Sequence, residues 1–371
     1  MIKFSKPNIN TTILNQVSKV LKSGWLTHGK FTKRFEDEIK KYTGARYCTL
    51  VSSCTAALHL SCLALNLKKG DEVIVPAMTH TASSHAIEYT GAKPVFADIN
   101  FENGNISMNS IKNLINKKTK AIIVVHMAGR LCLMNELNKI IKNKKISIIE
   151  DCAHGLGTKL NGKHSGNFGV SGCFSFYPTK QITTGEGGAI ITNNLKFYKK
   201  VKTLKAFGID KDINERKKPG EYNVKSLGYN YRMTDFQAAM GFFQLKNYSS
   251  NLGRRQTIAK KYISILKKNQ NIILPRFSLN DSYFVFQILL KNKKLKNDLM
   301  KKFKEKKVGI SVHYGTALPE MDFYKKKYKL PKKKFMNSKQ YAEKVISLPV
   351  YPKLTDKNIK TICNIINSIS A

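Results

Sequence analysis

Lys180 lies in the part of the sequence most suggestive of chemistry. The surrounding run, residues 175–188, reads SFYPTKQITTGEGG. Its proline and glycines favour a turn over a helix, so we expect the lysine to project from irregular backbone, where functional residues are frequent. A lysine so placed can form a Schiff base with a carbonyl compound. The alternative is a solvated surface lysine, which is the common case in a chain with 65 Lys and Arg residues.

A second segment carries small hydroxylated residues at the expected junction of a strand and a helix. It reads SSCTAAL and spans residues 52–58. The amide groups at the start of a helix bind anions, so these residues could hold a phosphate group. Serine and threonine are also the usual N-terminal caps of helices, and an ordinary cap is the simpler interpretation of this segment taken alone.

An acidic residue, Asp151, follows the apolar stretch at residues 146–149 and precedes His154. A carboxylate at the carboxyl end of a strand can pair with a cationic ring nitrogen of a ligand. Alternatively, Asp151 caps the next helix, and both side chains bind only their neighbours. A metal site is disfavoured, because two ligands three residues apart lack a third candidate nearby.

Together, the three segments match the needs of one cofactor, pyridoxal 5′-phosphate (PLP). This cofactor requires a lysine for covalent attachment, a carboxylate at its pyridine nitrogen and a cradle for its phosphate. We expect Asp151 to keep the ring nitrogen protonated, and Lys180 to move a proton at the substrate carbon as general base and acid. That task requires a lysine pKa well below the value of an exposed lysine.

Extended and helical segments alternate through the first part of the chain. Short β-rich runs, separated by stretches of helical length, occur at residues 47–51, 72–75, 94–97, 121–125 and 146–149. This alternation predicts an α/β fold with a mostly parallel sheet and helices on both faces, whose ligands collect at the carboxyl ends of the strands. Residues 31–42 show helical spacing that ends at Gly44.

Beyond about residue 245 the pattern changes to lysine-rich helical segments with a few strands, at residues 283–290 and 309–313. We therefore expect two domains, a large one at residues 1–245 and a smaller α+β domain at residues 246–371. A chain of 371 residues is long enough for both.

The formal net charge of +41 raises the alternative of a basic nucleic-acid-binding or regulatory protein. The lysines are dispersed, and the sequence has no helix-turn-helix or aromatic-basic motif, so we expect no nucleic-acid partner. The seven cysteines form no CxxC pair, which indicates reduced thiols. No signal peptide or membrane-spanning stretch is found, and we expect a cytoplasmic protein without a membrane partner.

The whole chain resembles the DegT/DnrJ/EryC1/StrS family of sugar aminotransferases, which have the fold of aspartate aminotransferase (fold type I). Besides the Lys180 loop, the matching motifs are SGWLTHG at residues 23–29, GDEVIVPAMT at 70–79, EDCAH at 150–154, GYNYRMTD at 228–235 and SLPVYP at 347–352. The resemblance implies PLP as the cofactor and a large domain built on a seven-stranded, mostly parallel sheet, followed by a smaller α+β domain.

Carried over by position, the resemblance implies that Lys180 forms the Schiff base, Asp151 pairs with the pyridine nitrogen and Ser175 contacts the phosphate. The phosphate cradle would be completed by Ser53, Cys54 and Thr55. His80 stands where the family usually has an aromatic residue stacked on the cofactor. His154 stands where a glutamine is frequent, and it could bind the cofactor's phenolic oxygen or lie against the ring.

Asn230 would reach the phosphate of a neighbouring subunit, so the resemblance implies a homodimer with its active site at the subunit interface. Contacts with the substrate are expected from Trp25, His313 and Tyr314. The implied reaction moves an amino group, most simply from L-glutamate, to a keto group of a nucleotide-linked sugar for surface polysaccharide or glycoconjugate synthesis. One branch of the family dehydrates such sugars, but it replaces the lysine with histidine, so Lys180 argues against that alternative.

Overall fold

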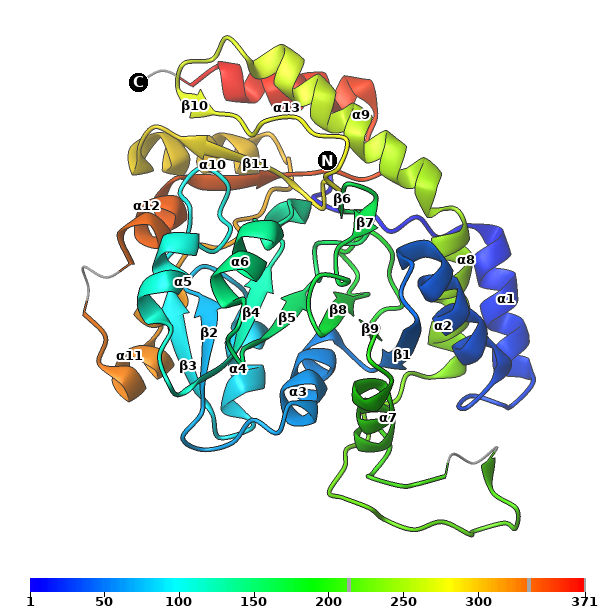
Figure 1. The fold of residues 1–371 in the computed structure, drawn as a ribbon. Helices are drawn as coiled ribbons and strands as arrows, with labels where there is room; N and C mark the ends of the chain where they lie inside the picture. Colours follow the sequence, from blue (N-terminus) through cyan, green and yellow to red (C-terminus); the bar gives the residue numbers. More distant parts are fainter. Residues whose placement is uncertain (212–214, 332–334, 370–371) are drawn as a thin grey trace.

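The computed structural model describes residues 1–211, 215–331 and 335–369. Its centre is a seven-stranded sheet flanked by helices (Figure 1). In spatial order the strands are β1 (Tyr47–Val51), β9 (Gly188–Thr192), β8 (Ser171–Ser175), β5 (Ser147–Asp151), β4 (Thr119–Val125), β2 (Glu72–Pro76) and β3 (Lys93–Ala97). All neighbouring pairs are parallel except the two that involve β9. The predicted α/β fold with a mostly parallel sheet is confirmed.

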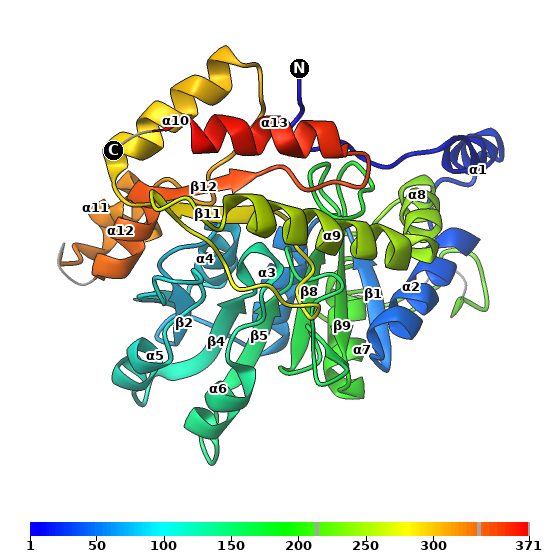
Figure 2. The same cartoon turned by 90° about the horizontal axis from the view of Figure 1, so that it is seen from above.

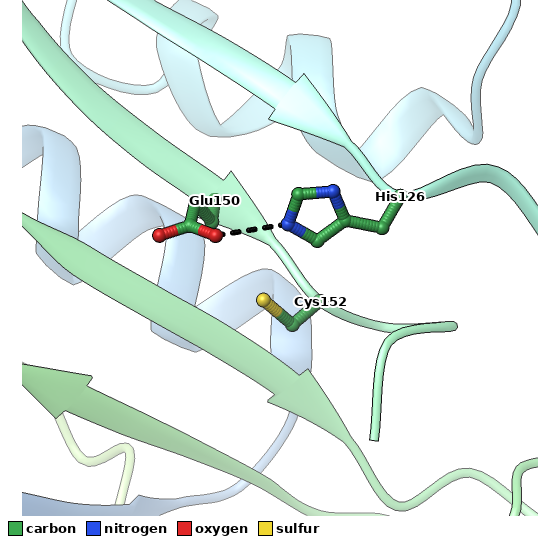
Figure 3. A group of neighbouring side chains, drawn as sticks. All are labelled: His126, Glu150 and Cys152. Atoms are coloured by element: carbon green, nitrogen blue, oxygen red, sulfur yellow. Dashed lines mark hydrogen bonds and ion pairs between the residues drawn. The ribbon is translucent and has the colours of Figure 1, made fainter. Parts of the chain in front are cut away.

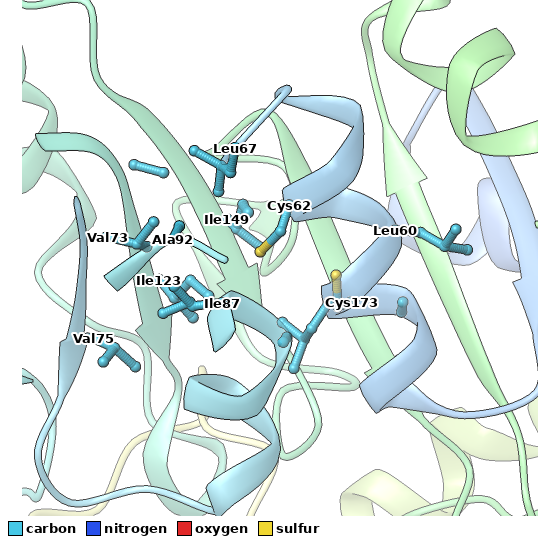
Figure 4. Packing of buried hydrophobic residues seen from close by; sticks show 14 of the residues in the cluster. Leu60, Cys62, Leu67, Val73, Val75, Ile87, Ala92, Ile123, Ile149 and Cys173 are labelled. Carbon is cyan, nitrogen blue, oxygen red and sulfur yellow. The ribbon is translucent and has the colours of Figure 1, made fainter. Parts of the chain in front are cut away.

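The central strands are apolar on both faces, as parallel sheets covered by helices require. Successive side chains of a strand point to opposite sides, so Val73 and Val75 of β2 join one buried cluster and Ile74 joins another. Figure 4 shows the first cluster, which also contains Ile123 of β4 and Ile149 of β5. Burial on both sides explains why these strands are continuous apolar runs in the sequence.

Helices cover both faces of the sheet (Figure 2). The first cluster includes residues of α3 (Cys54–Ala64), α4 (Thr81–Glu88) and α7 (Leu195–Leu204). The opposite face is covered by α5 (Met108–Leu114), α6 (Met134–Ile141), α2 (Lys30–Thr43) and α8 (Asp235–Lys246), with α1 (Thr11–Lys22) beside α8. Among the described residues, no helix has both the length and the apolar character needed to cross a membrane.

The predicted end of α2 is confirmed. Phe31, Phe35 and Ile39 are buried on one face of this helix, and Gly44 follows it with a φ of 76°. Glycine adopts this left-handed conformation without a steric penalty, so Gly44 ends the helix as its position in the sequence predicts.

The C-terminal part of the chain forms a second, antiparallel sheet of β10 (Ile272–Ile273), β11 (Phe286–Leu290) and β12 (Val345–Leu348). A separate buried cluster joins this sheet to α9 (Tyr248–Leu266), α10 (Lys293–Glu305) and α13 (Asp356–Asn367). The shorter elements are β6 (Lys159–Leu160), β7 (Lys163–His164), the 3-10 turns η1 (Met127–Gly129) and η3 (Leu318–Glu320), α11 (Asp322–Tyr328) and α12 (Met336–Lys344). The division of the chain at residue 245 stays a prediction.

The prediction of a strand at residues 309–313 is wrong. Within this segment only Ser311 pairs with a strand, through Ser347 of β12. The backbone groups at its start are taken by the N-terminus instead, since the Gly309 amide donates to the carbonyl of Ile2 at 2.7 Å. The segment therefore lies between the N-terminal residues and the edge of the second sheet.

The strand register brings separate segments to one edge of the central sheet. Asp151, the last residue of β5, pairs with Cys173 of β8, and Ser175 at the end of β8 pairs with Gly188 of β9. Gly188 pairs in turn with Val51, the last residue of β1. The carboxyl ends of three strands therefore meet at the place where open α/β sheets bind ligands.

Candidate active site

A cavity of about 410 Å³ opens at this edge of the sheet. Most residues predicted for the site line it, namely Ser53, Cys54, Thr55, His80, Asp151, His154, Ser175, Lys180, His313 and Tyr314. Trp25 and Asn230 do not line it, and both are exposed at the surface of the chain. A single chain thus brings together the residues predicted for the cofactor, except Asn230, with His313 and Tyr314, and leaves Asn230 and Trp25 outside the cavity.

Lys180 occupies the predicted turn. Its amide donates to the carbonyl of Tyr177 at 2.9 Å, and its ammonium nitrogen lies 4.4 Å from the centre of the Phe284 ring. Burial lowers the pKa of Lys180 to about 8, although the negative charge of Asp151 opposes the shift. A large fraction of this lysine is therefore neutral near pH 8 and can act as a nucleophile or a base.

Asp151 is buried and makes contacts through both carboxylate oxygens. Oδ1 accepts from the amide of Ala153 at 3.0 Å and lies 3.9 Å from the Cys54 thiol. Oδ2 accepts from the Ser83 hydroxyl at 2.8 Å. The residues after Asp151 form turns rather than a helix, so this carboxylate does not cap a helix.

The start of α3 is both a capped helix end and a candidate anion cradle. The Ser53 hydroxyl accepts from the amide of Ala56 at 3.1 Å, so the ordinary N-cap is present. A Cβ atom on Gly188 would lie 2.6 Å from the carbonyl carbon of Ser53, and only a glycine allows β9 to pass this close. The first amides of a helix lack partners within the helix, and here they lie beside a cavity that can hold an anion.

His154 is a buried and neutral imidazole. Its ring stacks on Phe284 with the ring centres 4.2 Å apart and an interplanar angle of 11°. Its carbonyl accepts from Gln181 Nε2 at 2.7 Å and from Ser282 Oγ at 2.9 Å. Burial, and then the charge of Lys180, hold the pKa of His154 well below 6.5. Its Nδ1 is buried and has no hydrogen-bond partner among the described residues, which leaves it for a ligand.

Two further histidines line the cavity. The Nδ1 of His313 lies 2.9 Å from the Ser347 hydroxyl, and its carbonyl accepts from Gln287 Nε2 at 3.0 Å. Burial, followed by the charge of the nearby lysine, lowers the pKa of His313 to about 3. His80 caps α4, because its Nδ1 accepts from the amide of Ala82 at 3.2 Å. Both rings are thereby oriented before any ligand binds.

A separate buried cluster of His126, Glu150 and Cys152 has the composition of a metal site (Figure 3). Most of its ligand atoms are already engaged. His126 Nε2 donates to Glu150 at 2.9 Å, and His126 Nδ1 accepts from the amide of Cys132 at 3.3 Å. At 2.6 to 2.8 Å the carboxylate also accepts from the amides of Gly166, Phe168 and Gly169. We therefore interpret the cluster as an anchor for the loop before β8.

Two residues near the site were missed by sequence reasoning, namely Ser83 and Phe284. Phe284 belongs to the C-terminal part of the chain, yet its ring contacts both Lys180 and His154. No local signal marks Phe284, because its role arises from tertiary packing. The contact of the Ser83 hydroxyl with Thr79, which ends the GDEVIVPAMT motif and precedes the predicted site residue His80, could not be inferred from the sequence.

A family model described as the DegT/DnrJ/EryC1/StrS aminotransferase family matches residues 7–367. The chain belongs to this family. It is 34% identical to the GDP-perosamine synthase of Escherichia coli O157:H7, over 98% of this chain and 96% of that protein. It is 31% identical to the spore coat polysaccharide biosynthesis protein SpsC of Bacillus subtilis, over 99% of this chain and 97% of that protein.

The solved structure of Spr1654 from Streptococcus pneumoniae, in its pyridoxamine phosphate (PMP) form, matches with a TM-score of 0.94 and 30% identity, and the match covers 99% of this chain and 98% of that one. The same protein is also known in a PLP form. The predicted fold type I, the aminotransferase class and the PLP cofactor are thus confirmed for this chain.

The residues of the cavity fit this cofactor. Lys180 offers an amine with a pKa of about 8, and Asp151 offers a carboxylate that lines the cavity. His154 offers a buried nitrogen without a partner. The start of α3 offers amides for a phosphate. Each polar group of PLP can therefore find a partner of the right kind in this chain.

The rate at which the PLP-free enzyme reacts with PLP should rise with pH and level off above about pH 8. The reason is that only a neutral amine attacks a carbonyl group, and burial lowers the pKa of Lys180 from 10.5 to about 8. Stopped-flow absorbance between about pH 6 and about pH 10 measures this profile, with Lys180→Ala as the blank. A rate that still climbs at the upper end would show that the lysine has the pKa of an exposed one.

Proposed function

We propose that the enzyme transfers the amino group of L-glutamate to a keto group of a nucleotide-linked sugar. The observation that carries this proposal is Lys180, with its pKa of about 8, in the same cavity as Asp151. The substrate class is supported by two relatives, one named a GDP-perosamine synthase and the other a spore coat polysaccharide biosynthesis protein. We infer that the product serves surface polysaccharide or glycoconjugate synthesis.

The residues predicted for the cofactor each have a role in this proposal. PLP, when bound, supplies a carbonyl group for the bond to Lys180 and a ring that accepts electrons from the substrate carbon. Lys180, released from this bond when the substrate amine takes its place, removes a proton from the substrate carbon as general base and delivers it, as general acid, to the cofactor carbon to which the lysine was bound. Asp151 keeps the proton on the ring nitrogen through its negative charge. The phosphate is held by Ser53, Cys54, Thr55 and Ser175.

The histidines bind through hydrogen bonds rather than through charge. Burial keeps His154 and His313 neutral, because it holds the pKa of each below the ordinary value. We propose that His154 offers its free nitrogen to the cofactor's phenolic oxygen, while His80 lies against the ring. Sugar hydroxyls then meet His313 and its neighbour Tyr314, and Trp25 contacts the outer part of the substrate.

We further propose a homodimer in which each chain completes the site of the other. Asn230 is exposed and lies outside the cavity of its own chain. Much of the described part of the segment between α7 and α8, residues 205–211 and 215–234, extends away from the body of the molecule (Figure 1) and exposes apolar side chains, of which Leu227 is 83% exposed. Exposed apolar groups of this kind favour a protein contact. In the dimer, Asn230 would bind the cofactor phosphate of the other chain.

The two alternatives from the sequence are less well supported. A sugar dehydratase is disfavoured by Lys180, because that branch of the family has histidine at this position. The family match over residues 7–367 leaves little of the chain for a separate nucleic-acid-binding domain.

L-Glutamate should bleach the visible absorption band of the PLP-loaded enzyme, because the amino group moves onto the cofactor and its conjugated carbonyl derivative is lost. A nucleotide-linked keto sugar added afterwards should restore the band. Absorption spectra measure both steps, with D-glutamate and the Lys180→Ala variant as controls. A band that persists with L-glutamate would show that the amino donor is another compound.

Mixing two impaired variants tests whether the site is shared between chains. Lys180→Ala removes the base, and Asn230→Ala weakens phosphate binding. If Asn230 acts across the interface, one site of each mixed dimer keeps both residues, and an equal mixture should recover about a quarter of wild-type activity at limiting PLP. If Asn230 acts within its own chain, mixed dimers contain no intact site and the mixture gains nothing.

A further inference from the structure

A buried chain of hydroxyl groups leads to Asp151. The Ser83 hydroxyl donates to Asp151 Oδ2 at 2.8 Å, and the Thr79 hydroxyl lies 3.0 Å from that of Ser83. Thr79 lies between β2 and α4, Ser83 belongs to α4 and Asp151 ends β5. These hydrogen bonds therefore link two segments whose strands, β2 and β5, are separated in the sheet by β4. All three residues are buried, with 4% exposure at most.

The Asp151 carboxylate fixes the direction of the hydrogen bonds between these hydroxyl groups. An ionised carboxylate can only accept, so Ser83 must give its single proton to Asp151. The Ser83 oxygen can then only accept in its contact with Thr79, which makes Thr79 the donor. Both hydroxyl groups are thus oriented toward the carboxylate, and each hydrogen bond polarises the next.

The carboxylate of Asp151 keeps acceptor capacity toward the cavity. A carboxylate offers about four lone-pair directions. Oδ1 accepts from the Ala153 amide at 3.0 Å and lies 3.9 Å from the Cys54 thiol. Among the described residues, only Ser83 donates to Oδ2, at 2.8 Å. An N–H group of a ligand can therefore bind Oδ2 without displacing a protein donor.

We infer that Ser83 and Thr79 are positioning residues, which hold the Asp151 carboxylate with one direction of Oδ2 open for the ring nitrogen of PLP. The inference rests on the proposed pairing of Asp151 with that nitrogen. With a donor on each oxygen, the carboxylate cannot rotate without breaking a hydrogen bond, so the cofactor meets a preorganised partner. The competing interpretation is that the hydroxyl chain only ties α4 to β5 and stabilises the fold.

The test compares PLP binding by Ser83→Ala and Thr79→Val with binding by a matched control, Ser84→Ala. Ser84 is the next residue and is as buried as Ser83, but in the part of the chain that the structure describes it has no hydrogen bond to Asp151. Fluorescence titration gives the dissociation constant of PLP. Visible circular dichroism of bound PLP reports how firmly its ring is oriented, and unfolding of the PLP-free proteins reports stability.

We expect Ser83→Ala to weaken PLP binding about tenfold and to reduce the visible circular dichroism per bound PLP, because a hydrogen bond to a charged group is lost. Thr79→Val should change both readouts in the same direction by a smaller factor. Ser83→Thr keeps the hydroxyl group and should stay close to wild type. Ser84→Ala should leave both readouts unchanged.

Wild-type PLP binding and circular dichroism in Ser83→Ala, with a loss of stability alone, would overturn the positioning role. Asp151→Asn separates this failure from a failure of the proposed function. If Asp151→Asn is impaired while Ser83→Ala is not, only the positioning inference is wrong. If Asp151→Asn also binds PLP like the wild type, the pairing of Asp151 with the ring nitrogen is wrong as well.

Discussion

A lysine and an aspartate line the same cavity, and this placement is the constraint on which the site depends. Removal from water disfavours the charged form of an amine, and burial accordingly lowers the pKa of Lys180 to about 8. Asp151 opposes the shift, and the Phe284 ring, 4.4 Å from the ammonium nitrogen, also favours the charged form. The balance leaves a lysine that can both give and take a proton near neutral pH.

The end of β5, where Asp151 lies, is held in place by hydrogen bonds to two successive carboxylates. Successive side chains of a strand point to opposite faces, so Glu150 and Asp151 contact different layers of the protein. Glu150 accepts from His126 and from backbone amides of the loop before β8, whereas Asp151 contacts Cys54 and Ser83 on the other side. Burying a carboxylate without such donors is costly. Glu150 therefore fixes the position of the end of β5, and Asp151 provides the carboxylate of the site.

Local patterns in the sequence were enough to predict five strands of the central sheet and the lysine turn, because both depend on neighbouring residues. Apolar runs mark buried strands, and the proline and glycines around Lys180 exclude a helix. Contacts between distant segments left no such signal. Ser83 and Asp151 are 68 positions apart, and Phe284 reaches the lysine from the C-terminal part of the chain. The strand expected at residues 309–313 failed for the same reason, since the N-terminus takes its backbone groups. The predicted roles of Trp25 and Asn230 stay predictions, because they involve the substrate or a second chain.

Transfer of nitrogen-15 from labelled L-glutamate to a nucleotide-linked keto sugar, followed by mass spectrometry, tests nitrogen transfer at Lys180 most directly. GDP- and UDP-linked keto hexoses are suitable acceptors. We predict a labelled amino sugar from the wild-type enzyme and none from Lys180→Ala. An enzyme that binds PLP but yields only a dehydrated sugar, or leaves every acceptor unlabelled, would contradict the proposed amino transfer.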